Sequence, residues 1–209
     1  MVRMKNYKNW LWFLLFGSLW GLSEVIVGEA LWAKSLPYTS VLLSAWALLM
    51  LAMGRGIVNV PGSSTAIGAF AALFKLVNAA PFFCHLLGIF ALGIAFDVAA
   101  TLLMKKTRKF SFRSLLTGVI SVYGGYALFA LLITYVIRYD VWAQGGLPKV
   151  LNHIFVSGSY AALTGLVAVP LGFWVGINGE VFAERRPRWA YAGAIVALVV
   201  VWALGRIVG

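Results

Sequence analysis

The chain has 209 residues, of which 62% are hydrophobic and 11% charged, and it carries a formal net charge of +11 and one cysteine. Because about half of the residues in a soluble domain are apolar, this composition excludes a soluble globular domain, and the single cysteine excludes an internal disulfide. We therefore predict an all-α, polytopic transmembrane helix bundle. Such a protein would be a multi-pass protein of a prokaryotic cytoplasmic (inner) membrane, in contact with membrane lipids.

Seven membrane spans are predicted in a single integral membrane domain that covers residues 1–209. A transmembrane helix needs about 20 mostly apolar residues. The predicted spans are 10–33, 38–54, 62–80, 82–104, 114–137, 151–177 and 189–207, and the predicted breaks between the last three spans are 138–149 and 179–188. The first span follows a basic N-terminus as a signal peptide does, but it contains Glu24 and lacks an A-x-A site, so we expect it to be uncleaved.

Basic residues gather in alternate loops of this predicted topology. With the N-terminus inside, twelve Lys and Arg fall in inner segments, at 3–8, 55, 105–113 and 185–188, against four in outer segments. Inner loops of membrane proteins carry such an excess, so we predict a cytoplasmic N-terminus and an outer C-terminus. The same distribution explains the net charge without nucleic acid as a partner.

Two predicted spans each carry one charged residue among small residues at helical spacing. These sets are Gly17, Gly21, Glu24 and Gly28 in the first span, and Gly68, Ala72, Lys75 and Ala79 in the third. A face of small residues lets another helix approach closely, so both charges are expected to point into the protein. An unpaired charge there costs about 3 kcal/mol or more, so we predict a Glu24–Lys75 ion pair. The alternative that this pair only pins two helices together stays open.

The sixth predicted span carries a stripe of hydrogen-bonding side chains. The stripe consists of His153, Ser157, Tyr160 and Thr164, which are spaced as on one face of a helix. Asn152 lies beside it. Such a stripe usually faces water, a ligand or polar groups of neighbouring helices. The alternative is that each hydroxyl bonds to the backbone of its own helix.

Most polar side chains in the predicted spans lie in the outer half of the membrane. We expect them to converge on an outward-facing cavity, the usual setting of a small-molecule site. The predicted substrate-binding residues are Glu24, Lys75, Asn78, His85, Asn152, His153, Ser157 and Tyr160. Glu29 is expected at the hydrated rim. Asp97, in the inner half, is expected to anchor helix packing within reach of an inner Arg or Lys.

The sequence lacks the usual signatures of catalytic and metal sites. It contains no HExxH or CxxC spacing and no GxSxG turn, so we predict that the protein is not an enzyme and has no metal site or catalytic residue. A haem held by His85 and His153 is geometrically allowed. A pair of interfacial histidines is more often only hydrogen-bonded, so no cofactor is predicted.

A small, basic, wholly membrane-embedded chain with an outer polar pocket resembles the substrate-binding (S) component of energy-coupling factor (ECF) transporters. The resemblance rests on size, topology and the segments "WGLSEVIVGEAL" and "GSSTAIGAFAALFKL", and it covers residues 10–177. It implies capture of a vitamin-like molecule or metal at the outer face, and docking on a transmembrane coupling subunit with cytoplasmic ATPases. It also implies that Gly17/Gly21 or Gly68/Ala72 could form the docking surface. The family usually has six spans, so span 189–207 would be an addition.

A second interpretation of the same sequence is a structural or assembly subunit of a larger respiratory or photosynthetic membrane complex, with no ligand of its own. Abundant glycine and tryptophan suit helix–helix contacts in either case. An intramembrane enzyme is a third interpretation, which no nucleophile–base pair supports. An outer cavity distinguishes the first two, because a scaffold would fill it with side chains.

Overall fold

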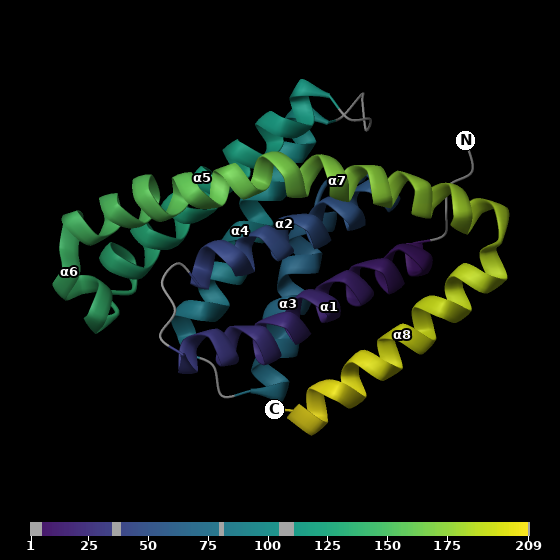
Figure 1. Ribbon diagram of the computed structural model, residues 1–209, viewed down its shortest axis with the longest axis horizontal. Helices are drawn as coiled ribbons and strands as arrows, with labels where there is room; N and C mark the ends of the chain where they lie inside the picture. Colours follow the sequence, from purple (N-terminus) through teal and green to yellow (C-terminus); the bar gives the residue numbers. More distant parts are fainter. Residues whose placement is uncertain (1–5, 35–38, 80–81, 105–110, 209) are drawn as a thin grey trace.

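In the computed structural model, which describes residues 6–34, 39–79, 82–104 and 111–208, every regular element within those ranges is a helix (Figure 1). The elements are α1 (Asn6–Ala33), α2 (Thr39–Ile57), α3 (Ser63–Asn78), α4 (Phe83–Leu103), α5 (Phe112–Leu131), the π-helical segment η1 (Leu132–Val136), α6 (Asp140–Leu151), the π-helical segment η2 (Asn152–Ser157), α7 (Gly158–Arg185) and α8 (Pro187–Val208). The predicted all-α bundle is confirmed.

Six helical stretches in the described residues are long and apolar enough to cross a membrane, so a multi-pass membrane protein is supported. They include α8, the additional C-terminal span. Helix α3, predicted as the third span, has 16 residues and is about 24 Å long, less than the roughly 30 Å of bilayer hydrocarbon. Much of the predicted charge bias belongs to Arg3, Lys5 and residues 105–110, which lie outside the described residues.

The predicted break at 138–149 is wrong over most of its length, because α6 occupies residues 140–151 and continues into η2 and α7. The helix is interrupted only at Gly146, whose φ of 53° and ψ of −152° are accessible to glycine. Pro148 follows in the first turn of the next helical stretch, where its missing N–H is not needed. Helix α7 also extends to Arg185 and α8 begins at Pro187, so the break predicted at 179–188 is reduced to Arg186.

Close helix contacts in the core are made at glycines. A Cβ atom added at Gly17 would lie 2.5 Å from Phe70 Cβ, and one at Gly21 would lie 2.6 Å from Phe74 Cβ, so α1 packs directly on α3. Gly68 of α3 meets Gly93 of α4 in the same way, with an added Cβ 3.1 Å from the opposite Cα. The small-residue faces that the family resemblance offered for docking a partner are therefore internal, and that expectation is wrong.

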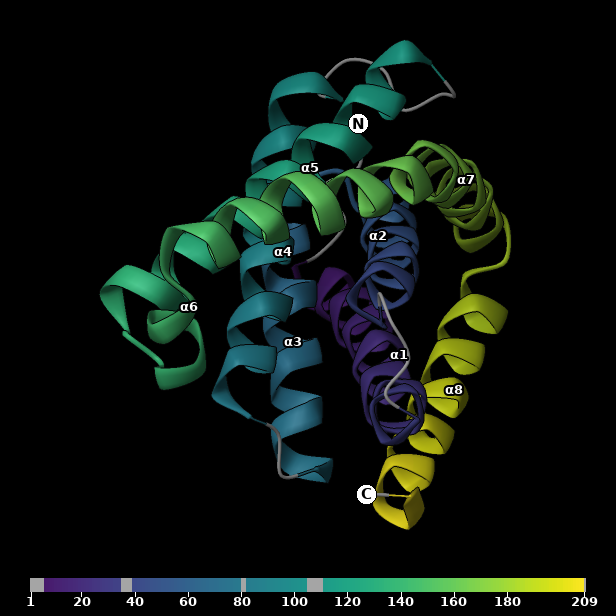
Figure 2. The ribbon, with the colours of Figure 1, turned by 60° about the vertical axis from the view of Figure 1, so that its left-hand side comes forward.

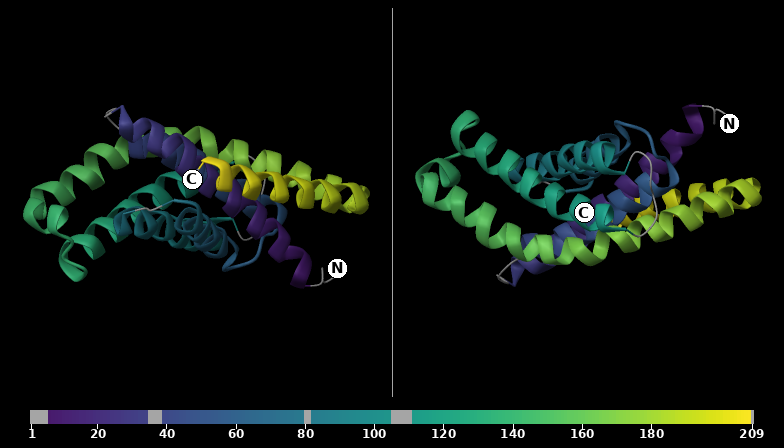
Figure 3. Two further views of the ribbon diagram at one scale, coloured as in Figure 1. Left: turned by 90° about the horizontal axis from the view of Figure 1, so that it is seen from below. Right: turned by 90° about the horizontal axis from the view of Figure 1, so that it is seen from above.

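The last two helices, α7 and α8, lie along the outside of the bundle. Helix α7 runs along its length and the chain then turns sharply into α8, which returns beside α1 (Figure 1, Figure 2). Views from above and below show the end of α6, η2 and α7 as one long arc (Figure 3). Helix α8 is fastened to α1 and α3 through Trp202, whose Nε1 donates to Ser18 Oγ at 3.0 Å and whose ring meets Phe74 edge-on.

A buried polar cluster joins α2, α3 and α4 at the end of the bundle where α3 begins. Arg55 Nη1 donates to Asp97 Oδ1 at 2.8 Å, and Arg55 Nη2 donates to Thr101 Oγ1 at 2.8 Å. Asp97 also accepts hydrogen bonds from the backbone N–H groups of Gly62 and Ser64, so it caps the N-terminus of α3. This arrangement agrees with the prediction that Asp97 anchors helix packing through a basic residue.

Candidate functional site: a polar-walled cavity

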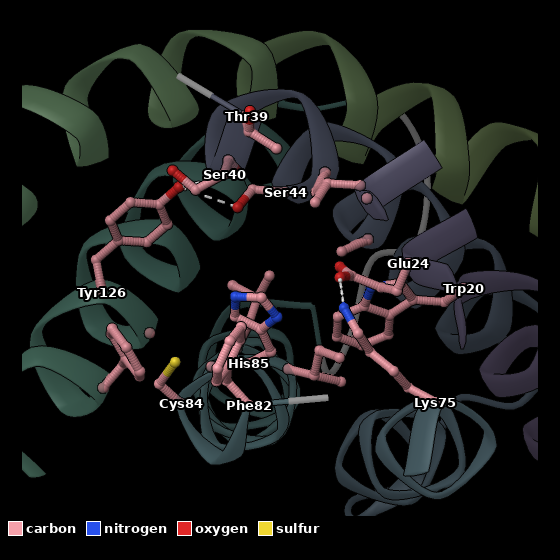
Figure 4. Close-up of a pocket in the computed structure, with 18 of the residues that line it drawn as sticks. Trp20, Glu24, Thr39, Ser40, Ser44, Lys75, Phe82, Cys84, His85 and Tyr126 are labelled. Carbon is pink, nitrogen blue, oxygen red and sulfur yellow. Dashed lines mark hydrogen bonds and ion pairs between the residues drawn. The ribbon is translucent and has the colours of Figure 1, made fainter. Parts of the chain in front are cut away.

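The end of the bundle opposite Arg55 and Asp97 contains a cavity of about 340 Å³. It lies where α1, α3 and α5 end and where α2, α4 and η2 begin, so six elements contribute to its walls. This volume falls at the small end of the range typical of ligand sites. Figure 4 shows the side chains that converge on it.

One wall carries the predicted ion pair. Lys75 Nζ of α3 donates to Glu24 Oε2 of α1 at 3.0 Å, and both residues are buried, with 4% and 7% of their surface exposed. Trp20 Nε1, one helical turn before Glu24, donates to Glu24 Oε1 at 3.3 Å. Gly28 lies beside the pair, where an added Cβ would be within 4 Å of both charged groups. The prediction of a Glu24–Lys75 pair is confirmed.

The opposite wall carries a hydroxyl pair that the sequence did not single out as part of the site. Ser44 Oγ of α2 and the Tyr126 hydroxyl of α5 lie 3.0 Å apart, and Tyr126 also donates to the Ser40 carbonyl at 3.3 Å. Because 82 positions separate Ser44 from Tyr126, no spacing rule within one helix could have joined them.

Two histidines line the cavity in different settings. The His85 imidazole of α4 stands between Tyr126 and the Glu24–Lys75 pair, with the Phe82 ring edge-on to it (Figure 4). The His153 ring of η2 stacks on Tyr126, with ring centroids 4.6 Å apart and an angle of 16° between their planes. Phe129 and Trp142 also contact the His153 ring. Packing alone therefore accounts for the position of His153.

Four of the eight predicted substrate-binding residues line the cavity: Glu24, Lys75, His85 and His153. Glu29, predicted at the rim, is exposed and lines it as well. The other four are placed elsewhere: Asn78, Asn152, Ser157 and Tyr160. Half of the predicted residue set is thus brought together, and it comprises all of the predicted charged and imidazole side chains.

Two features of the structure explain why predicted residues lie outside the cavity. Asn78 is buried against α8, where Gly205 approaches its side chain, and its Nδ2 donates to the Phe74 carbonyl of its own helix. Residues 152–157 are π-helical, and the i→i+5 turns of a π-helix rotate side chains away from the face that α-helical spacing predicts. Consequently the residues after this turn no longer share the face of His153, and the Tyr160 side chain lies on the outside with 48% of its surface exposed.

The stripe predicted on the sixth span is therefore not one polar face. Thr164 Oγ1 donates to the Ala161 carbonyl of its own helix, as the backbone-bonding alternative described. Ser159, which the stripe did not include, accepts or donates a 2.7 Å hydrogen bond with the Tyr123 hydroxyl of α5. The hydroxyl groups of Ser159 and Thr164 in α7 thus form hydrogen bonds with backbone carbonyls of their own chain segment and with Tyr123 of α5.

The described residues contain no group of three or more His, Cys, Asp or Glu side chains placed to hold a metal ion. The groups that line the cavity are one compensated ion pair, one further carboxylate, two imidazoles, one thiol, hydroxyl groups and aromatic rings. Such walls can bind and orient a small organic molecule. No family model, curated protein or solved structure matches the chain.

Proposed function

We propose that the protein is the membrane-embedded substrate-capture component of a small-molecule uptake transporter. It binds its substrate in the cavity between α1–α5 and η2 and then docks on a coupling subunit. In this proposal the N-terminus is cytoplasmic and the cavity opens to the outside, as the distribution of basic residues in the sequence favours.

The observation that carries the proposal is the cavity and the polar groups that line it. A buried ion pair on one wall, a hydroxyl pair on the other and an imidazole between them surround about 340 Å³ of space. Concave, largely apolar sites with a few convergent polar groups are how proteins usually bind small molecules. A subunit that served only as a scaffold would gain more stability by filling this space with side chains.

Native mass spectrometry of the protein extracted in mild detergent tests the proposal. We expect a bound small molecule, and we expect a transmembrane coupling subunit and ATPases to copurify. The Glu24→Gln variant should retain the small molecule at least tenfold less well, because the charge that holds Lys75 in the wall is lost. Glu184→Gln, on the exposed far end of α7, is the matched control and should behave as the unmodified protein.

Two results would contradict the proposal. One is a folded protein that carries no small molecule in repeated preparations from its own membrane. The other is copurification with an oxidoreductase or photosynthetic core in place of ATPases, which would favour the interpretation as a structural subunit.

A further inference from the structure

We infer that the substrate of this cavity is a small organic cation with an aromatic or apolar body. The inference rests on the proposed function, because it names the chemical class of the molecule that the cavity captures. The charge balance of the cavity carries it, and the aromatic rings of the walls support it independently.

The cavity has the opposite charge to the chain as a whole. Its described walls contain two carboxylates, Glu24 and Glu29, and one ammonium group, Lys75, which gives a formal charge of −1 with histidines neutral. The whole chain carries +11 by the same convention. A cation is therefore attracted into the cavity, whereas the protein outside it is strongly basic.

The described walls offer an anionic substrate no unpaired ammonium or guanidinium group. The Lys75 ammonium already donates to Glu24 at 3.0 Å and is buried, so an anion would have to compete with a neighbouring carboxylate for it. Glu29, by contrast, is exposed at the cavity and forms no salt bridge with any described residue. Its carboxylate is the group that an incoming ammonium would meet.

Aromatic rings line the same space. Trp20 lies beside the ion pair, Tyr126 and Phe129 form the opposite wall, and the exposed Phe82 ring lies beside His85. The face of an aromatic ring attracts an organic cation, and more strongly where water is excluded. These rings also provide apolar contact for the body of the substrate.

Three probes that share a phenyl ring separate charge from shape: benzyltrimethylammonium, 2-phenylethanol and 3-phenylpropionate. Cys84 lines the cavity and is the only cysteine of the chain, so an occupied cavity should slow its reaction with N-ethylmaleimide. We expect benzyltrimethylammonium to protect Cys84 at a concentration at least tenfold lower than 2-phenylethanol. We expect 3-phenylpropionate to protect it least.

Two variants assign the preference to the cavity. Glu29→Gln should reduce the tenfold preference for the cation to less than threefold while 2-phenylethanol protects as before. Glu184→Gln, which removes the same charge far from the cavity, should leave the preference unchanged. Equal protection by all three probes, or strongest protection by 3-phenylpropionate, would overturn the cation assignment and leave small-molecule capture standing. Protection by none of them, with no small molecule in native mass spectra, would overturn both proposals.

Discussion

At the scale of single residues, the described part of the bundle contains two buried ion pairs, Glu24–Lys75 and Arg55–Asp97, at opposite ends. Charged side chains are tolerated within membrane spans only when they are paired or face a polar space. Each pair also has further hydrogen bonds, from Trp20 at one end and from the backbone at the start of α3 at the other. Each of these buried charges within an apolar sequence is therefore neutralised by an oppositely charged partner.

The Glu24–Lys75 pair makes a prediction about stability. Lys75→Met should destabilise the protein by about 3–5 kcal/mol, because the Glu24 carboxylate would remain buried without its partner. The double variant Glu24→Gln with Lys75→Met should recover most of that loss, since no uncompensated charge remains. Thermal unfolding can be followed by the loss of the circular dichroism of the helices. A double variant that loses the sum of the two single effects would show that the charges are not coupled.

At the scale of elements, the position of Glu24 relative to Lys75 depends on how closely α1 approaches α3. Gly17 and Gly21 lie on the same face of α1 as Glu24, and the backbone of α3 fills the space that side chains would occupy. Loss of this close approach should therefore affect both stability and the ion pair.

Gly17→Ala tests this dependence. The added Cβ would meet Phe70 Cβ at 2.5 Å and the Ile67 carbonyl at 2.7 Å, so α1 and α3 must move apart. Overpacking of this kind costs about 1–3 kcal/mol, and we expect the unfolding midpoint to fall accordingly. Gly193→Ala in α8 is the matched control, because nothing lies within 4 Å of its added Cβ. Equal midpoints for the two variants would contradict the close α1–α3 contact.

At the scale of the whole molecule, the cavity and the Arg185–Arg188 turn lie at opposite ends of α7. In the proposed orientation, which has the N-terminus inside, the cavity would be on the outer side and this basic turn on the cytoplasmic side. The single native cysteine makes the orientation directly measurable, because Cys84 belongs to the cavity wall.

A membrane-impermeant maleimide added to intact cells should label Cys84 in the unmodified protein. A Cys84→Ser, Arg186→Cys variant should be labelled only after the membrane is permeabilised. The opposite pattern would place the N-terminus outside and reverse the direction in which the cavity opens. Cys84→Ser alone is the control for labelling elsewhere.

Much of the fold could be predicted from the sequence because the relevant physics is local. Apolar runs of sufficient length predict the spans, and the boundaries of α2, α4 and α8 agree with prediction to within a few residues. The boundary at 138–149 failed because Gly146 and Pro148 are signals of a loop as well as of a short helix interruption. Distinguishing these two requires the contacts of α6 with the rest of the bundle.

The sequence alone determined that the chain is a helical membrane protein and that Glu24 must find a cation, because helical periodicity and the cost of an unpaired buried charge do not depend on packing order. Only the tertiary structure decided which groups share the cavity. Ser44 meets Tyr126 because α2 and α5 border the same cavity, and Tyr160 points away from it because η2 is π-helical. Distances between helices arise from the packing of many side chains at once, which no spacing along one helix encodes.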